Sequence, residues 1–175
     1  MAKQSDPTIQ YVRQRIELDP ITGRLYWRYS PCLPQRWNSR WAGKPALSSF
    51  SQGYLSGSLL NRKTYAHRVV FALYYGRWPV GEVDHIDGNR ANNHPSNLRE
   101  ATKRQNQLNS RSRDGSTSRY RCVYRQNGKW RVQANVDGRK VHVGVFDDES
   151  EAAAAFNRFA VDNLGSRARL NVIGD

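Results

Sequence analysis

The chain has 175 residues, of which 38% are hydrophobic and 11% are aromatic. This composition permits one modest domain or two small domains with packed cores, and it excludes general disorder. The formal net charge is +13. Excess Lys and Arg can simply keep a chain in solution, but this excess indicates a polyanionic partner, with nucleic acid favoured over a membrane surface because no basic amphipathic helix is present.

Membrane and secretory classes are disfavoured. No apolar run approaches the roughly 18 residues of a spanning helix, and the first residues, MAKQSDPTIQ, lack the apolar stretch of a signal peptide. Cys32 and Cys122 are far apart and form no CxxC pair. We therefore expect neither a structural zinc site nor a disulfide framework, and a reducing cytoplasm suits the chain.

The first part of the chain contains short extended segments separated by Gly and Pro. Residues 25–29, LYWRY, have the aromatic content of a strand. Residues 54–60 and 63–65 flank Asn61-Arg62, which predicts a hairpin. A helix is expected next over residues 66–75, because apolar residues recur there at helical spacing and Gly76 marks its end.

Residues 83–109, VDHIDGNRANNHPSNLREATKRQNQLN, place an Asp-His pair ahead of six asparagines. The pattern predicts a short strand over 83–87, a loop, and a returning strand over 97–102. Thr102 and Gln105 have the spacing of a capping box, so a helix that carries Asn106 should start there.

These residue types suit metal-assisted phosphodiester cleavage, which needs a base for the attacking water and a cation for the charge that develops. His85 is a candidate base, and Asp84 and Asn106 offer hard oxygen ligands for magnesium. Neighbouring strand residues point to opposite faces, so Asp84 and His85 share a site only if the strand is twisted, bulged or ending there.

Other polar residues of this region have simpler interpretations. The loop asparagines, Asn89, Asn92 and Asn93, are expected to shape turns and to do no chemistry. His67 opens the predicted helix, where packing or capping is favoured over contact with DNA.

After a polar stretch over residues 110–118, which predicts a linker, the pattern changes. Residues 130–136 and 140–143 alternate apolar and polar side chains around an Asp137-Gly138 turn, and an alanine-rich helix is expected from Asp147 to Leu164. Seven Lys or Arg and one acidic residue lie over 119–146, against five acidic residues and one Arg over 147–164. A basic sheet with an acidic helix behind it is equipped to read base edges in a major groove, although a solvated sheet without a partner is the alternative.

Two resemblances bear on these patterns. The phrase DHIDGN…NN…NLRE.T..QN..N and the lead-in AHRVVFALYYGRWPVGEVDH closely resemble the HNH endonucleases, also called ββα-metal nucleases, over roughly residues 20–110. The resemblance implies that His85 is the general base, that Asp84 and Asn106 are metal ligands, and that Asn97 ties the loop to the strand and orients the histidine. It implies one divalent cation per site and products with 5′-phosphate and 3′-hydroxyl ends. Asparagine at the last motif position favours Mg²⁺, with Mn²⁺ as a substitute, over zinc.

Residues 119–171 resemble the Apetala-type DNA-binding domain of plant ethylene-response factors through their YRxV, GKW, HxGxF and ARLN elements. That resemblance implies that the sheet enters the major groove of DNA. The chain departs from the pattern at Cys122, where the family usually has glycine, and at Tyr124, where plant members have arginine. The sheet positions that match the DNA-facing set are Arg121, Tyr124, Arg131, Gln133, Asn135, Lys140 and His142.

The sequence thus predicts an α+β protein. It comprises a nuclease module over residues 1–110, a linker over 111–118 and a DNA-binding domain over 119–173, with a three-stranded antiparallel sheet packed on one helix. The expected function is site-specific cleavage of double-stranded DNA by a phage homing endonuclease in the host cytoplasm, acting as a monomer or a DNA-induced dimer. Phosphate contacts are expected from Arg99, Lys103 and Arg104. The alternatives are a catalytically silent DNA-binding regulator and a structure-specific or RNA-directed nuclease.

Overall fold

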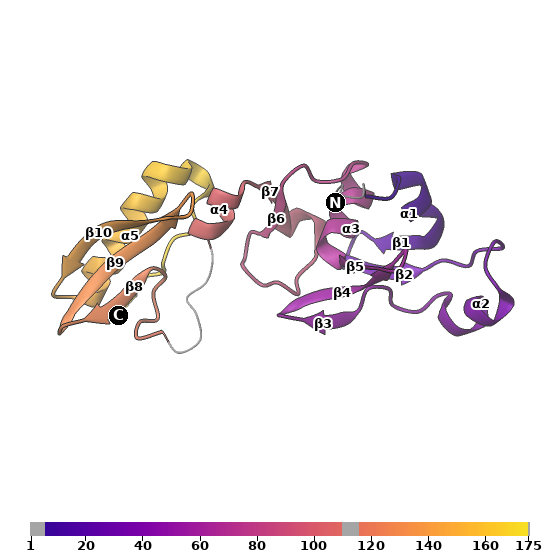
Figure 1. Ribbon diagram of the computed structural model, residues 1–175, viewed down its shortest axis with the longest axis horizontal. Coiled ribbons are helices and arrows are strands. Elements are labelled where there is room, and N and C mark those ends of the chain that lie inside the picture. The colour runs from indigo at the N-terminus through magenta and orange to yellow at the C-terminus, as the bar shows by residue number, and fades with distance from the viewer. Residues whose placement is uncertain (1–5, 110–115, 175) are drawn as a thin grey trace. The chain divides into compact units, whose positions relative to one another are not determined.

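The computed structural model describes residues 6–109 and 116–174. Most of the expected linker, residues 111–115, lies outside the described residues. The chain forms two compact units, Met1–Glu100 (unit 1) and Ala101–Asp175 (unit 2), and both mix helices with strands (Figure 1). The predicted α+β class is therefore confirmed. No helix of the described part is long and apolar enough to cross a membrane.

Unit 1 is built from three small sheets around one central helix. Its paired strands are β1 with β2, β3 with β4 and β5, and β6 with β7. The elements in chain order are α1 (Ile9–Arg15), β1 (Ile16–Asp19), β2 (Arg24–Trp27), α2 (Gln35–Trp41), β3 (Ser49–Ser51), β4 (Tyr54–Leu59), β5 (Arg62–Tyr65), α3 (Ala66–Tyr75), β6 (Glu82–His85), a 3-10 turn η1 (Pro95–Asn97) and β7 (Leu98–Ala101).

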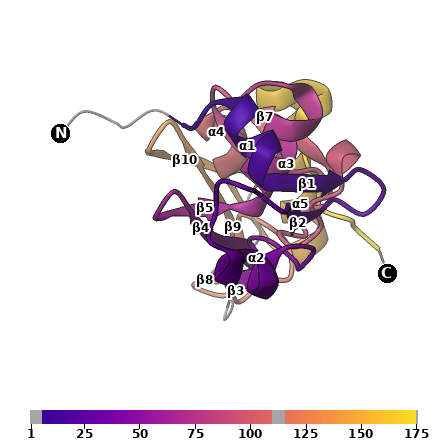
Figure 2. The same ribbon diagram turned by 90° about the vertical axis from the view of Figure 1, so that its right-hand side faces the viewer.

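The core of unit 1 gathers on α3. Val69 and Val70 of this helix are fully buried, and α1 and β1 add Val12 and Ile16 to the same cluster. Figure 2 shows α1 and β1 beside α3. The helix has the predicted bounds, and Gly76 caps it in the left-handed conformation, with φ 70°. Packing on α3 therefore joins the hairpin before it to strand β6 after it.

The hairpin β4–β5 turns at Leu60 and Asn61, one residue earlier than predicted. Both residues have positive φ values, 53° and 57°, which is the backbone of a type I′ turn. Asparagine tolerates this conformation better than most residues do, whereas leucine is unusual there. Asn61 therefore lies in the turn, as predicted. The turn residues are Leu60 and Asn61, and not Asn61 and Arg62, because Leu59 pairs with Arg62.

Unit 2 is a three-stranded antiparallel sheet in the order β10-β9-β8, packed on one long helix, as predicted. Val132 and Ala134 of the middle strand and Phe156 of the helix are almost fully buried between the two layers. The elements are α4 (Lys103–Leu108), β8 (Val123–Gln126), β9 (Lys129–Val136), β10 (Arg139–Phe146), α5 (Glu149–Leu164) and a 3-10 turn η2 (Gly165–Arg167).

The boundary between the compact units falls after Glu100, whereas the sequence placed the end of the nuclease module at residue 110. Helix α4 belongs to unit 2 because Leu108 is buried in the core of that unit. Asn109, at the end of the helix, donates to the Arg167 carbonyl over 3.0 Å and accepts from the Arg169 N–H over 2.8 Å. The predicted sequence of two strands followed by a helix is thus present as β6, β7 and α4. The helix packs in the core of unit 2.

Candidate active site

Asp84 and His85 end strand β6, and both side chains are buried. Arg99, on the paired strand β7, donates to Oδ2 of Asp84 from Nε over 3.1 Å and from Nη2 over 2.9 Å. The His85 ring instead contacts Asn93 of the following loop. The two neighbouring side chains therefore have different partners, as alternation along a strand requires.

The loop after β6 is organised by Asp87 and Asn97. The carboxylate of Asp87 accepts hydrogen bonds from Asn92 Nδ2 (2.8 Å), Asn97 Nδ2 (3.0 Å) and the Asn89 N–H (2.7 Å). Asn97 also accepts from the Asp87 N–H over 3.0 Å and donates to the Asn92 carbonyl over 2.8 Å. Burial raises the pKa of Asp87, but these hydrogen bonds outweigh it and lower the pKa overall. Asn97 thus ties the loop together, and Asn89 and Asn92 shape turns.

Asn93 has a different position from the other loop asparagines, and sequence reasoning missed it. Its Oδ1 lies 3.0 Å from Nε2 of His85, and both residues are about 4% exposed. An amide oxygen accepts and cannot donate, so this contact keeps the imidazole proton on Nε2 and leaves the lone pair on Nδ1. In this tautomer Nδ1 of His85 is the acceptor nitrogen of the ring.

The turn between β1 and β2 packs against the backbone of Asn93. Gly23 is buried, with φ +70°, and a Cβ at this position would overlap the backbone carbonyl of Asn93. Only glycine combines this backbone conformation with so close an approach. Unit 1 therefore fixes the loop from outside as well as through its own hydrogen bonds.

His85 also belongs to a group of four rings, which we call the imidazole cluster: Tyr54, Tyr65, His67 and His85. The two histidines are buried and the two tyrosines are partly buried. The centroids of His67 and His85 are 5.3 Å apart at an interplanar angle of 75°, and His67 stacks on Tyr65 at 5.5 Å and 20°. Nδ1 of His67 is buried without a hydrogen-bond partner among the described residues. The preference for packing over DNA contact at His67 is consistent with this placement, and its neighbour is the candidate base.

Burial determines the charge of both histidines. It lowers the pKa of His67 to about 3, with smaller contributions from His85 and Arg68. It also lowers the pKa of His85, although the hydrogen bond to Asn93 and the nearby carboxylates of Asp87 and Asp84 oppose the shift. Both imidazoles are therefore neutral near pH 7, which is the state that a general base requires.

We expect acid to destabilise the protein through His67. Its folded-state pKa, about 3, lies below the ordinary 6.5, so the unfolded chain binds a proton more readily than the folded chain. The contribution of His67 is complete above pH 6.5 and declines as the pH falls toward 3. The free energy of unfolding is measured by urea titration with tryptophan fluorescence at pH 7 and pH 4.5. Its decrease between these two pH values should be about 2 kcal/mol smaller in His67→Phe than in the parent.

Phenylalanine is the matched replacement because it keeps a ring beside Tyr54, Tyr65 and His85 but does not titrate. Four of the five tryptophans lie in unit 1, so the fluorescence reports mainly on that unit. His85 titrates in both proteins and Arg68 stays charged in both, so neither contributes strongly to the difference. Equal acid sensitivity of the two proteins would contradict the role assigned to His67.

The other candidate ligand, Asn106, lies in the first turns of α4 in unit 2. The predicted capping box is confirmed: Thr102 Oγ1 accepts from the Gln105 N–H, and Gln105 Oε1 accepts from the Thr102 N–H. In the described residues no three His, Cys, Asp or Glu side chains are grouped to hold a metal. Carboxylate and amide oxygens are hard ligands of the kind that divalent cations such as Mg²⁺ accept.

Three basic residues predicted to contact phosphate have protein partners or lie on the surface. Arg99 pairs with Asp84, as described above. Arg104, on α4, donates to Asn163 Oδ1 over 2.6 Å and lies 3.7 Å from an Asp137 carboxylate oxygen. Lys103, beside it, is exposed. In this structure Lys103 is thus the most accessible of the three.

On the outward face of the unit 2 sheet, four of the predicted residues form two hydrogen-bonded pairs. Tyr124 donates to Gln133 Oε1 over 2.7 Å, and Arg131 Nε donates to His142 Nδ1 over 3.3 Å. The register pairs Tyr124 with Arg131 and Gln133 with His142 across neighbouring strands. Asn135 and Lys140 are also paired, and both are exposed.

Arg121 lies elsewhere. It is 6% exposed, and its guanidinium lies 5.6 Å from the centre of the Phe156 ring. Its backbone exchanges hydrogen bonds with the side chain of Asn171 at 2.9 and 3.3 Å. The structure therefore places Arg121 in the interior of unit 2 and not on the outward face.

The segment that carries the candidate site is similar to known nucleases. Residues 64–108 match the family described as HNH endonuclease. A protein of Acanthamoeba polyphaga mimivirus, named "Uncharacterized HNH endonuclease L560", is 34% identical over 113 residues, which cover 63% of this chain and 59% of that protein. No solved structure matches the chain. Together, these similarities support a nuclease.

Proposed function

We propose that the protein is a metal-dependent endonuclease that hydrolyses phosphodiester bonds of double-stranded DNA. The observation that carries the proposal is the buried His85, whose Nε2 is held by Asn93 within the segment similar to HNH endonucleases. A neutral imidazole that donates from Nε2 keeps an acceptor lone pair on Nδ1, as a general base needs. The net charge of +13 supports a polyanionic substrate.

In the proposed reaction, Nδ1 of His85 accepts a proton from the attacking water as the water oxygen bonds to phosphorus. The bond from phosphorus to the 3′ oxygen breaks, and this oxygen takes a proton from a solvent water, which leaves a 5′-phosphate and a 3′-hydroxyl. Asn93 orients the ring, and Asn97 holds the loop in which Asn93 lies. A bound divalent cation supplies charge stabilisation at the phosphate and the leaving oxygen. We propose Asp84 and Asn106 as its protein ligands and Mg²⁺ as the ion, with Asn106 resting on the sequence resemblance.

We also propose that the sheet of unit 2 reads DNA in the manner of the Apetala-type domain. Cys122 supports the resemblance, because it stands where that family usually has glycine and has a positive φ of 61°. Arg131, Gln133 and His142 supply the donors and acceptors that base edges require. We further propose that the protein is a phage homing endonuclease, which rests on the sequence resemblance; the similar mimivirus protein is named as an HNH endonuclease and is also viral.

The direct test is cleavage of a random-sequence duplex library by the purified chain, in Mg²⁺ and in EDTA, with the product ends mapped. We expect cuts with 5′-phosphate ends in Mg²⁺ and none in EDTA. Binding without cleavage in any divalent metal would favour the silent regulator. Preferential cleavage of RNA would favour the RNA-directed alternative.

A truncated chain that ends at residue 118 should separate reading from cutting. This truncation removes the sheet and α5, which cover Leu108, so folding of the shortened chain is checked first by circular dichroism. We expect a metal-dependent nuclease with weaker and less selective DNA binding. The measurement is the cleavage-site profile of both chains on one library.

A full-length variant makes the same test without truncation. Gln133→Ala on the outward face should relax selectivity at one or two base positions, by about 1–3 kcal/mol for a good bidentate contact. Lys140→Ala should instead weaken all sequences alike if it contacts phosphate, and lower the salt slope by about one unit. If the cleavage-site profile of every variant were identical to that of the parent, the proposal that the sheet recognises the DNA sequence would be contradicted.

A further inference from the structure

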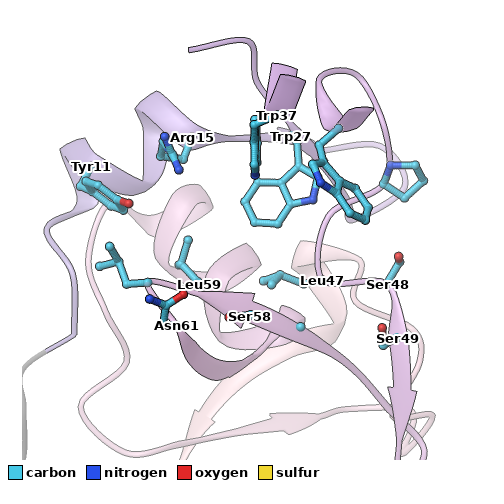
Figure 3. A pocket seen from close by; sticks show the side chains of 14 residues that line it. Tyr11, Arg15, Trp27, Trp37, Leu47, Ser48, Ser49, Ser58, Leu59 and Asn61 are labelled. Atoms are coloured by element: carbon cyan, nitrogen blue, oxygen red, sulfur yellow. The ribbon is translucent and has the colours of Figure 1, made fainter. Parts of the chain in front are cut away.

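Unit 1 contains a cavity of about 500 Å³ whose wall is rich in tryptophan. Trp27, Trp37 and Trp41 line it together with Tyr11 and Arg15 of α1. Figure 3 shows Trp27 and Trp37 on one side, facing Leu47, Ser58 and Leu59 on the other. A volume of this size is typical of a small-molecule site and exceeds the voids of a packed core.

The aromatic wall is preformed. Trp27 and Trp37 meet edge to face, with centroids 5.6 Å apart, and the Arg15 guanidinium lies 5.3 Å from the centre of the Trp37 ring. Trp41 remains 38% exposed. Unlike the valines on α3, these indoles are not fully covered by the rest of the protein, so flat apolar surface stays available to a ligand.

Arg15 has an unsatisfied donor at this site. Its Nε is buried and has no hydrogen-bond partner among the described residues. A buried donor without a partner costs about 1–3 kcal/mol, and an acceptor on a ligand would remove that cost after a small movement of the side chain. Arg15 therefore points to a ligand that carries acceptor atoms beside a flat ring.

The rest of the lining and the charge around it narrow the ligand class. Ser48, Ser49, Ser58 and Asn61 add hydroxyl and amide groups that both donate and accept. No Asp or Glu is among the residues that line the cavity in the described part of the chain. Residues 6–65 contain nine Lys or Arg and three Asp or Glu. The surroundings therefore favour an anionic ligand.

We propose that this cavity binds one unstacked base of a nucleic-acid strand, with the indoles stacking on the base and Arg15 and the serines contacting its polar edge. The inference rests on the proposed function, because a DNA substrate supplies the base. Stacking on aromatic side chains is how proteins bind unpaired bases with little sequence preference. The cavity would thus hold a distorted or single-stranded part of the substrate apart from the reacting phosphate.

The test titrates the full chain with single-stranded (dT)12 in EDTA, so that binding is measured without cleavage. We expect (dT)12 to quench tryptophan fluorescence. Trp37→Leu should weaken binding about 5-fold or more, since stacking contributes roughly 1–3 kcal/mol per base. Tyr74→Leu, an exposed aromatic of the same unit that does not line the cavity, should change the affinity less than twofold.

Ser58→Phe provides a second variant, because it fills the cavity and leaves the tryptophans in place. Unchanged (dT)12 affinity in both Trp37→Leu and Ser58→Phe would overturn the inference. A tryptophan-bearing peptide is titrated in parallel as a probe for a protein ligand. The inference would also be overturned if both variants lost affinity for this peptide and kept their affinity for (dT)12. Cleavage of duplex DNA in Mg²⁺ is scored separately. If the parent cleaves DNA and the cavity variants bind (dT)12 with full affinity, the nuclease proposal stands and the base site is contradicted. If (dT)12 binding depends on the cavity but the parent does not cleave, the base site stands and the nuclease proposal is contradicted.

Discussion

Replacing His85 with alanine is expected to abolish DNA cleavage and to leave DNA affinity within a few-fold of the parent. A general base lowers the barrier of the chemical step by about 10²- to 10⁴-fold in rate and contributes little to ground-state binding. The ring, with Nε2 held 3.0 Å from Asn93 Oδ1, is only 4% exposed and so offers little surface for binding DNA phosphates. Single-turnover cleavage in Mg²⁺ and a filter-binding titration in EDTA measure the two quantities separately.

Asn93→Ala provides the graded comparison for His85→Ala. It removes the contact that orients the ring and fixes its tautomer but keeps the imidazole, so cleavage should fall by less than in His85→Ala. Asn89→Ala, in the same loop, lacks a contact with His85 and serves as the control for changes in loop shape. Parent-like cleavage by His85→Ala would remove the base assignment. Equal rates for Asn93→Ala and Asn89→Ala would remove the positioning role of Asn93.

Removal of the metal should be as damaging as removal of the base. We expect EDTA to silence the parent, Mg²⁺ or Mn²⁺ to restore cleavage, and Zn²⁺ to be a poor substitute, because carboxylate and amide oxygens are hard ligands. Asp84→Ala should lose activity at all Mg²⁺ concentrations. Cleavage that persists in EDTA would exclude the metal mechanism.

The ion pair between Asp84 and Arg99 requires a specific control. Arg99 donates to Asp84 through two nitrogens, and both groups are largely buried, so Asp84→Ala also leaves a buried arginine without its carboxylate, which is strongly destabilising. Asp84→Asn keeps the shape and one acceptor oxygen. A thermal midpoint close to that of the parent, together with lost Mg²⁺-dependent cleavage, would distinguish a metal ligand from a purely structural carboxylate.

Local signals in the sequence predicted those elements whose shape is decided by neighbouring residues. Helix α3 has the predicted bounds because apolar spacing and Gly76 are both local signals. The Asp137-Gly138 turn has positive φ at both residues, 53° and 81°, as a two-residue hairpin requires. The capping box at Thr102 and Gln105 is likewise a contact across three residues. None of these depends on the rest of the chain.

Short elements without strong periodicity were missed. Helices α1 and α2 have seven residues each, and β3 has three, so each is too short for a hydrophobic pattern to be recognised. Their structure comes from tertiary packing, as Val12 of α1 shows by its complete burial in the core of unit 1. The tryptophan-lined cavity depends on these elements and was invisible for the same reason.

The sequence by itself determined the residue types of the candidate site, their order, and the α+β class. It supplied the Asp-His pair, a loop rich in asparagine, and a capped helix that bears Asn106. Only the tertiary structure decided that Asn93, among three similar loop asparagines, faces His85, that Arg121 is buried against Phe156, and that α4 packs in unit 2. The physical reason is distance along the chain. Turn and capping energies depend on residues a few positions apart, whereas the partner of a buried polar side chain is chosen by segments that meet only when the core forms.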